Sequence, residues 1–378
     1  MRSLIPSTDE ALALIEKVDP KFRPVWEEHP LNEQVALAQY FLPHRSAKEV
    51  IGPTRPRVAK WYCPFAAQNE FPSGHRYCIN VFTGCDHRCV YCYASSYEPD
   101  APRPKDRFYD LLVKDMEDLE RFAVPPAPVH LSNSTDPLQP LEQKTGHLRS
   151  ALEQIQAHRH RFTTVVILTK NPLLAVQLGY ADLFKKLSLL PPDYPKHEAF
   201  DRQQLPGFIM EVSLAFWREE AREVYDPGAP SVESRIQGLR ALHAQGVPLV
   251  LRIDPLFPHS PLPTNPAQCL GDFGLPEAQT LEDLDALVRL AREVEARHVV
   301  YSSAKIVQPR GRKLSEIMQA MRRMYETVAS PHKLDFHGGS WRLPWPVAKA
   351  HVVQPFLDIC QSLGVRTKYC KQNLTETP

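Results

Sequence analysis

Short apolar runs alternate along the chain with longer segments in which apolar residues recur every three or four positions. Continuous apolar runs are typical of parallel strands buried on both faces, and the longer pattern is typical of amphipathic helices. The predicted strands are Tyr77–Thr83, Pro128–Ser132, Thr164–Thr169, Phe208–Ser213, Pro248–Ile253 and His298–Ser302. The predicted helices span residues 106–122, 146–158, 173–187, 231–245, 281–297 and 312–328. Thr280 and Asp283 are placed to cap the start of the fifth helix.

Six strand–helix units in this order predict an α/β fold. They are too few to close an eight-unit barrel, so an open β/α barrel is favoured and a doubly wound sheet is the alternative. Residues 61–328 would form this barrel. Residues 1–60 predict an N-terminal helical extension. Residues 329–378 predict a C-terminal tail that packs on or caps the barrel, with one helix near residues 348–363.

The composition adds limits on compartment and partners. The chain has 378 residues, of which 43% are apolar, which supports a packed core. It carries 45 Lys and Arg residues against 44 Asp and Glu residues, so no overall positive charge marks it as a nucleic-acid binder. Without an export signal or an apolar run of membrane length, the eight cysteines predict a cytoplasmic protein with no membrane contact.

Local basic patches are still able to contact a polynucleotide, although each one is more typical of a solvated face. The candidate patches are Arg55/Arg57/Lys60, residues 158–161 and Arg310/Arg312/Lys313.

Three cysteines carry the main chemical signal. Cys85, Cys89 and Cys92 form a C-x3-C-x2-C array directly after the first predicted strand. An iron–sulfur cluster is normally held by four cysteines, so three thiolates leave one iron open to a small molecule. A zinc site would need two ligand pairs or a histidine at finger spacing, and His87 has no downstream pair. The array therefore indicates an iron–sulfur cluster in preference to zinc or a disulfide.

The cysteine array, with Tyr91 directly before the third cysteine, resembles the radical S-adenosylmethionine (radical SAM) superfamily. The resemblance implies a 4Fe–4S cluster held by Cys85, Cys89 and Cys92, with S-adenosylmethionine bound to the open iron through its amino and carboxylate groups. It implies a 5′-deoxyadenosyl radical that abstracts hydrogen from a substrate, an external reductant of the flavodoxin or ferredoxin type, and contact of Tyr91 with adenine. It also favours a partial (β/α)6 TIM-type barrel.

Polar residues follow the ends of the later strands, where barrels of this kind place their chemistry. For a zwitterionic cofactor, Lys170 or Arg252 is expected to hold the methionine carboxylate, and Asp136 to accept a hydrogen bond from the amine or the ribose. Capping of the next helix is the alternative role for such residues, and it is the one expected of Ser302 and Ser303.

Several segments narrow the resemblance to the spore photoproduct lyase-like branch, often described as DNA-repair photolyase-like. The matching segments are the cysteine loop, residues 134–142, Leu168–Asn171, residues 229–235 and residues 246–253, within a similarity that covers about residues 75–310. The resemblance implies that Thr135, Lys170 and Ser213 contact S-adenosylmethionine. It departs at Ser134, where lyases of this branch have a hydrogen-donating cysteine, because an O–H bond is a poorer hydrogen donor than a thiol.

The remaining cysteines have weaker signals. Cys78 and Cys360 are expected in the core, and Cys269 falls in a proline-rich loop. A second cluster would have to gather Cys63, Cys370 and others from distant segments. Lys368 and Lys371 favour a lowered pKa for Cys370, which would suit a hydrogen donor or a resolving thiol.

Three hypotheses for function follow from the sequence. The substrate is a nucleic acid or nucleotide, as the lyase-like resemblance implies. Alternatively it is a peptide, protein or small metabolite, in keeping with the near-neutral charge and with Ser134. In the third hypothesis the cluster only transfers electrons.

Overall fold

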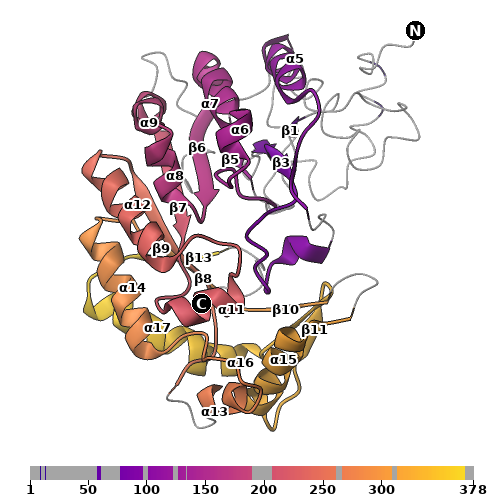
Figure 1. The fold of residues 1–378 in the computed structure, drawn as a ribbon, viewed down its shortest axis with the longest axis vertical. Coiled ribbons are helices and arrows are strands. Elements are labelled where there is room, and N and C mark those ends of the chain that lie inside the picture. Colours follow the sequence, from indigo (N-terminus) through magenta and orange to yellow (C-terminus); the bar gives the residue numbers. More distant parts are fainter. Residues whose placement is uncertain are drawn as a thin grey trace.

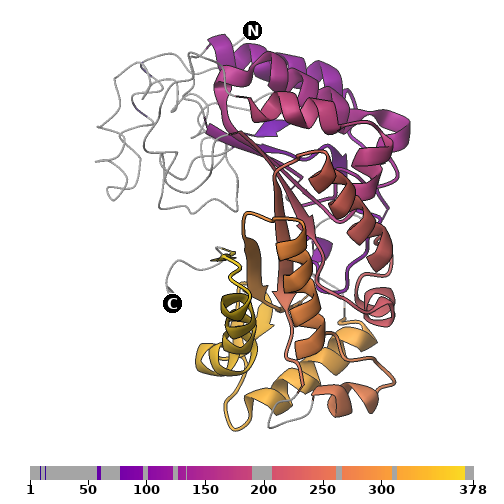
Figure 2. The same ribbon diagram turned by 90° about the vertical axis from the view of Figure 1, so that its left-hand side faces the viewer.

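A curved sheet of eight strands organises the part of the chain that the computed structural model describes (Figures 1 and 2). Apart from Asp9 and Ala13, the described residues are 58–60, 77–96, 101–121, 127–132, 134–189, 207–260, 266–308 and 313–370. In spatial order the strands are β1 (Ala59–Lys60), β2 (Tyr77–Ile79), β5 (Ala127–Leu131), β6 (Phe162–Thr169), β7 (Gly207–Ser213), β8 (Leu249–Leu256), β9 (Val299–Ser303) and β13 (Thr367–Tyr369). All neighbours pair in parallel except β1, which is antiparallel to β2.

The predicted α/β fold class is confirmed, since each of the six predicted strands contributes to this parallel sheet. The first of them, Tyr77–Thr83, is broken into β2 and β3 (Phe82–Thr83), and β3 leaves the sheet to pair with β4 (Arg103–Pro104). Strands β1 and β13 were not predicted. Seven parallel strands with intervening helices agree with a partial TIM-type barrel.

Helices lie along the outer side of the sheet, one after another in chain order (Figure 1). The longer ones are α5 (Phe108–Arg121), α7 (His147–Ala157), α12 (Val232–Ala244), α14 (Leu281–Glu293) and α15 (Glu316–Ala329). The helix predicted at residues 173–187 is two helices, α8 (Pro172–Gln177) and α9 (Ala181–Ser188). They are separated by Gly179, whose φ of +68° suits a residue without a Cβ atom. The predicted cap is confirmed, because Thr280 and Asp283 form a capping box on α14.

The shorter helices lie in the connections and in the tail. They are α6 (Glu142–Thr145), α11 (Glu219–Tyr225), α13 (Pro266–Gly271), α16 (Trp345–Ala348) and α17 (Gln354–Ser362). A three-stranded sheet of β10 (Ile306–Val307), β12 (Ser340–Arg342) and β11 (Asp335–His337) lies apart from the large sheet.

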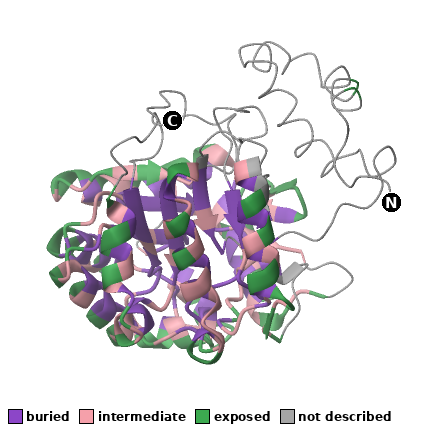
Figure 3. Cartoon of the chain, turned by 90° about the horizontal axis from the view of Figure 1, so that it is seen from above, coloured by how far each residue is buried: buried purple, intermediate pink, exposed green. Residues whose placement is uncertain are grey.

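The two faces of the large sheet have different surroundings. Phe208, Met210 and Val212 of β7 belong to the main core, and the strands are largely buried in the view of Figure 3. The alternate residue Ile209 points to the inner face, where it packs with Val250, Val300 and Cys370 in a separate small cluster. Toward the strand ends this inner face becomes polar, and the candidate site lies there.

The predicted helix near residues 348–363 is confirmed by α16 and α17, which a π-helical turn, Lys349–Val353, joins. The strand after α17, β13, pairs with β9. The division into extension, barrel and tail stays a prediction, and of the extension at residues 1–60 the structure describes only Asp9, Ala13 and residues 58–60. Among the described helices, none is long and apolar enough to cross a membrane.

One of the three basic patches is described in full. Its residues His158, His160 and Arg161 all contact a single carboxylate, that of Glu120 on α5. The fourth residue, Arg159, is buried and donates to the carbonyl of Leu187. These basic side chains are thus already engaged by contacts within the protein. Arg55, Arg57, Arg310 and Arg312 lie outside the described residues.

Candidate functional site

The three cysteines of the array lie in one loop, which follows β3. The N–H of Cys92 donates to the carbonyl of Cys89 over 3.1 Å, which closes a tight turn. Burial raises the pKa of the Cys85 thiol to about 12, and nearby Cys92 adds to this shift and also to that of Cys89. Within the described residues, no three His, Cys, Asp or Glu side chains converge on one point that would hold a single metal ion.

The second strand end holds one side of the cysteine loop. Asp136 accepts a hydrogen bond from the Nε2 atom of His87 over 2.9 Å. The side chain of Gln139, which has no exposed surface, accepts from the N–H of Asp86 and donates to the carbonyl of Gly84. Both contacts come from the polar run after β5, so this run fixes the backbone of the loop.

The turn after α11 holds the other side of the cysteine loop. The N–H of Val90 donates to the carbonyl of Tyr225, and the N–H of Gly228 donates to the carbonyl of His87 over 2.9 Å. A Cβ atom at Gly228 would collide with the backbone of Asp86, so only glycine allows this approach. The turn sequence Asp226-Pro-Gly-Ala-Pro230 bends the chain before Ser231, which caps α12.

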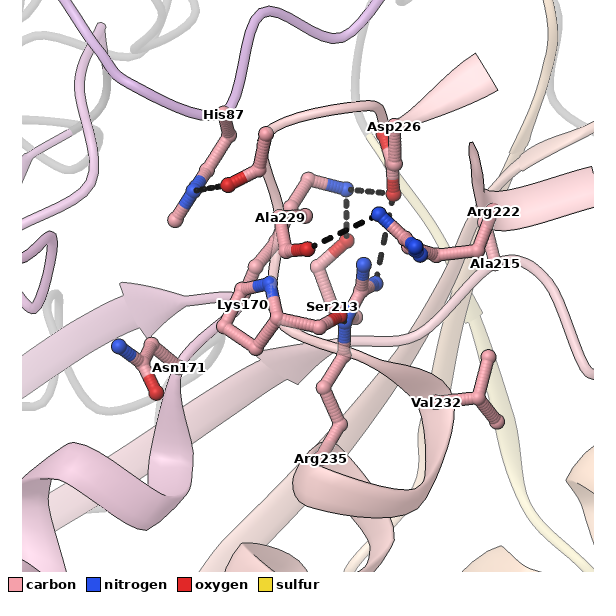
Figure 4. A network of polar contacts seen from close by, with 12 residues as sticks. His87, Lys170, Asn171, Ser213, Ala215, Arg222, Asp226, Ala229, Val232 and Arg235 are labelled. Atoms are coloured by element: carbon pink, nitrogen blue, oxygen red, sulfur yellow. Dashed lines mark hydrogen bonds and ion pairs between the residues drawn. The ribbon is translucent and has the colours of Figure 1, made fainter. Parts of the chain in front are cut away.

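Asp226 is the centre of a buried polar network beside the cysteines (Figure 4). Its carboxylate accepts hydrogen bonds from the Tyr91 hydroxyl over 2.6 Å and from the Lys170 Nζ atom over 3.0 Å. Arg235 lies 3.3 Å from the same carboxylate. Lys170 also donates to the Tyr91 hydroxyl over 2.8 Å and to the Ser213 hydroxyl over 3.1 Å. The network thus joins the cysteine loop to the ends of β6 and β7.

The charges in this network explain its pKa shifts. Burial would raise the pKa of Asp226, but Lys170 and Arg235 hold it well below its usual range. Burial and the charge of Asp226 raise the pKa of the Cys89 thiol, whose side chain hydrogen-bonds to that carboxylate. Within the described residues, Lys170 and Arg235 both pair with this one carboxylate. Lys170 opposes the rise in the pKa of Cys89, but burial and Asp226 outweigh it, so the Cys89 thiol has to lose its proton when a metal binds.

Two hydroxyl groups at the end of β5 have no hydrogen-bond partner within the described residues. They are the Oγ1 atom of Thr135 and the Oγ atom of Ser132, both buried. Ser132 also has a φ of +62°, a left-handed conformation that is rare for a residue with a side chain. An unpaired buried polar group costs about 1–3 kcal/mol, and a bound ligand that supplies the partner is one explanation for it.

The predicted cofactor residues fall into two groups. Lys170 contacts both Tyr91 and Ser213 beside Asp226. Asp136 is linked to them through the N–H of Lys170, and its pKa is lowered because the His87 ring and the other donors outweigh its burial. Thr135 lies next to it in the chain. Their contact with a cofactor stays a prediction.

Arg252 lies in a separate group on the inner face of β8. Its guanidinium pairs with Glu211 over 2.6 Å and with Asp254 over 2.5 Å, and it also donates to the Sγ atom of Cys370 over 3.1 Å. With both carboxylates engaged, Arg252 is charge-compensated without a cofactor, and its predicted role remains untested.

Ser302 and Ser303 were expected to cap the next helix, and this expectation is wrong. The Ser302 hydroxyl donates to Asp254, and the Ser303 hydroxyl has no partner within the described residues. Ser315 caps α15 instead. The two serines end β9, and a further short strand follows before the helix begins.

Sequence reasoning missed Asp226 and assigned no role to Arg235. Asp226 precedes Pro-Gly, so it has the appearance of an ordinary turn residue. Its partners Tyr91 and Lys170 are 135 and 56 positions away, and no local pattern connects them. The signal that was present is Arg235 itself, which lies among the apolar positions of a helix and has no exposed surface.

The other described cysteines are scattered. Cys78 and Cys360 are buried as expected, and Cys269 lies in the short helix α13, where a loop was predicted. Burial raises the pKa of Cys370 despite Arg252, so the expectation of a lowered pKa is wrong. Cys63 lies outside the described residues.

Comparison with known proteins gives distant relatives and a clear fold. No family model matches the sequence. The chain is 26% identical over 187 residues to an uncharacterized protein of Methanocaldococcus jannaschii, a match that covers 49% of this chain and 62% of that protein. It is 25% identical over 213 residues to an uncharacterized protein of Mycobacterium tuberculosis, covering 51% and 54% respectively. The matches thus span less than two thirds of these relatives.

Among solved structures the chain is similar to spore photoproduct lyase. One variant of that enzyme covers 84% of this chain and 81% of its own, with a TM-score of 0.53 and 13% identity. Another, described with bound AdoMet and dinucleoside spore photoproduct, covers 83% of this chain and 79% of its own, with a TM-score of 0.52 and 14% identity. The described barrel therefore has the fold of spore photoproduct lyase.

Proposed function

We propose that this protein is a radical SAM enzyme in which Cys85, Cys89 and Cys92 hold a 4Fe–4S cluster and the adjacent strand ends hold S-adenosylmethionine. When bound and reduced, this pair of cofactors supplies a 5′-deoxyadenosyl radical that abstracts hydrogen from a substrate. The observation that carries the proposal is the position of the cysteine loop. It is fixed on two sides, by Gln139 and by Gly228, at the strand ends of a fold shared with an AdoMet-binding enzyme.

The donor set suits the cluster. Three thiols lie in one loop near two buried cations, Lys170 and Arg235, and within the described residues these cations share one carboxylate partner, Asp226. Thiolates add negative charge, so an iron–sulfur cluster brings the local charge closer to balance.

The same strand ends suit a zwitterionic cofactor. Lys170 supplies an ammonium group for a carboxylate, and the hydroxyls of Thr135 and Ser132 are buried without a partner. A ligand with polar atoms at this place would satisfy those hydroxyls, which nothing in the described protein does.

The chain's own residues position the reacting groups. Asp136 ties the cysteine loop to the start of the segment after β6, because it accepts from both His87 and the N–H of Lys170. The Tyr91 ring packs on Phe216 and Phe257, which fixes the position of this residue directly before Cys92. This leaves Lys170 and Ser213 to orient the cofactor from the strand ends.

The test is anaerobic purification, reconstitution with iron and sulfide, and reduction in the presence of S-adenosylmethionine. Formation of 5′-deoxyadenosine is expected from the wild-type protein and from Cys269→Ala, whose thiol lies on α13. Replacement of Cys85, Cys89 or Cys92 by alanine is expected to abolish both the iron content and the nucleoside. Nucleoside formation that persists in all three variants would overturn the proposal, and so would wild-type protein that holds zinc in place of iron.

A nucleic acid is the substrate class we propose, because one similar enzyme was solved with a dinucleoside photoproduct. Ser134 stands against repair by the route that uses a cysteine there, so a different nucleic-acid reaction, or a peptide or metabolite substrate, is the alternative. If binding to a single-stranded oligonucleotide weakens steeply as the salt concentration rises, this result supports a nucleic-acid substrate. Salt-insensitive binding favours the alternative. A flavodoxin- or ferredoxin-type protein is the proposed electron donor.

A further inference from the structure

Asp226 and Arg235 form an ion pair in which neither side chain has exposed surface. Burying two charges costs several kcal/mol per ion, and replacing such pairs by apolar residues is often neutral or stabilising. Packing alone therefore gives no reason for this pair. Arg235 is fixed from three directions, since it donates to the carbonyls of Pro230 and Ser213 as well as to Asp226.

The position of the pair suggests what it acts on. The side chain of Cys89 hydrogen-bonds to the Asp226 carboxylate, and the Tyr91 hydroxyl donates to the same group. Arg235 approaches that carboxylate from the α12 side, as Figure 4 shows, together with Lys170. A negative charge is thus held at a fixed place beside Cys89, and the positive charge of Arg235 is held 3.3 Å from that carboxylate.

We propose that Asp226 and Arg235 are positioning residues that set the reduction potential of the cluster, with Asp226 opposing electron uptake and Arg235 favouring it. This inference rests on the proposed function, because it requires a cluster at Cys89. Reduction adds one electron from the external protein donor and makes the cluster more negative. A fixed carboxylate nearby disfavours that change and a fixed guanidinium favours it, and the low local dielectric strengthens both effects.

The experiment is a potentiometric titration, followed by electron paramagnetic resonance, on reconstituted protein without S-adenosylmethionine. Asp226→Asn is expected to shift the midpoint potential upward and Arg235→Gln to shift it downward. The double variant is expected to lie between them, because it removes one charge of each sign. Asp226→Glu keeps the charge and is expected to stay near the wild-type value.

Asp115→Asn is the matched control, since Asp115 is also fully buried but accepts hydrogen bonds from the backbone of residues 58 and 59. The midpoint potential of the cluster in this variant should equal the wild-type value. Should Asp226→Asn fail to hold a cluster, Asp226→Glu and Arg235→Gln still test the inference, because the first should keep the wild-type midpoint potential and the second should lower it. Shifts in the same direction, or none, would overturn the inference. Wild-type protein without any cluster would instead refute the proposed function, so the two failures are distinguishable.

Discussion

Gly228 lies so close to the cysteine loop that a Cβ atom at this position would stand 1.9 Å from the backbone oxygen of Asp86. The obstacle is backbone, so it cannot swing aside as a side chain would. A hydrogen bond from the N–H of Gly228 to the carbonyl of His87 marks the same contact. The turn after α11 and the cysteine loop therefore fit together only while residue 228 has no side chain.

Gly228→Ala is expected to push the two segments apart and to destabilise the protein by about 1–3 kcal/mol, the usual cost of overpacking. It should also lower the iron content after reconstitution, because the loop would no longer be fixed. Urea denaturation and iron analysis measure the two effects. The control is Gly271→Ala, since a Cβ atom at Gly271 meets nothing within 4 Å. Full iron content and unchanged stability in Gly228→Ala would contradict the geometry.

Thr135→Val tests the unpaired hydroxyl at the end of β5. The two side chains have nearly the same shape, so the free energy of unfolding should stay the same or rise slightly as the unsatisfied polar atom is removed. The affinity for S-adenosylmethionine should fall by about tenfold, the value of one hydrogen bond of about 1.4 kcal/mol. Equilibrium dialysis with the reconstituted protein gives this affinity.

Thr163→Val is the matched control for that variant, because the Thr163 hydroxyl is likewise buried with no partner among the described residues but lies near the start of β6. It should leave cofactor affinity unchanged. Equal losses of affinity in both variants would show that the Thr135 hydroxyl makes no special contact.

Lys170→Gln removes the ammonium group that links Tyr91, Ser213 and Asp226. A hydrogen bond to a charged group contributes about 1.5–3 kcal/mol, so the affinity for S-adenosylmethionine should fall by about 10- to 100-fold. Lys185→Gln on α9, whose nearest acidic partner Asp182 is 3.9 Å away at the surface, serves as the control. Undiminished binding by Lys170→Gln would remove Lys170 from the cofactor site.

Glu120 predicts a pH dependence of stability. Burial raises its pKa, but hydrogen bonds from Arg161, His158 and His160 together outweigh burial and lower the pKa to about 2, from 4.5. A carboxyl with a lowered folded-state pKa stabilises the protein above pH 4.5 and loses this contribution as pH falls toward 2. About a third of the side chain is exposed, so solvent screening limits the contribution to about 1 kcal/mol or less.

Glu120→Gln should therefore lower the free energy of unfolding at pH 6 and do so less and less as pH falls below 4.5. Chemical denaturation of wild type and variant between about pH 6 and pH 3 measures this difference. A difference that does not change with pH would show that the carboxylate charge has no part in the effect.

The sequence was sufficient for the elements whose signal is local. The strand Thr164–Thr169 was predicted because its apolar run has no other explanation than burial on both faces, and β6 contains it. In contrast, β13 is the tripeptide Thr367-Lys-Tyr369, which has no apolar pattern. Only its pairing with β9 makes it a strand.

The candidate site likewise contains residues that have a local sequence signal and residues that have none. The cysteine array and Lys170 could be predicted because each follows a predicted strand directly. Asp226 could not, because its partners come from β6, α12 and the cysteine loop, which only the folded chain brings together. The sequence motif identifies Cys89, whereas only the tertiary structure identifies the charged group beside it.

Because Gln139 and Gly228 hold the cysteine loop from two sides, the order in which the chain is synthesised matters for this loop. Residues 85–92 are immobilised by groups that are synthesised later, Gln139 first and Gly228 well after that. While the ribosome is still translating the intervening helices, the three sulfurs have no rigid frame. For the proposed cluster we therefore expect assembly only after residue 228 has been synthesised, when both sides of the loop can be held.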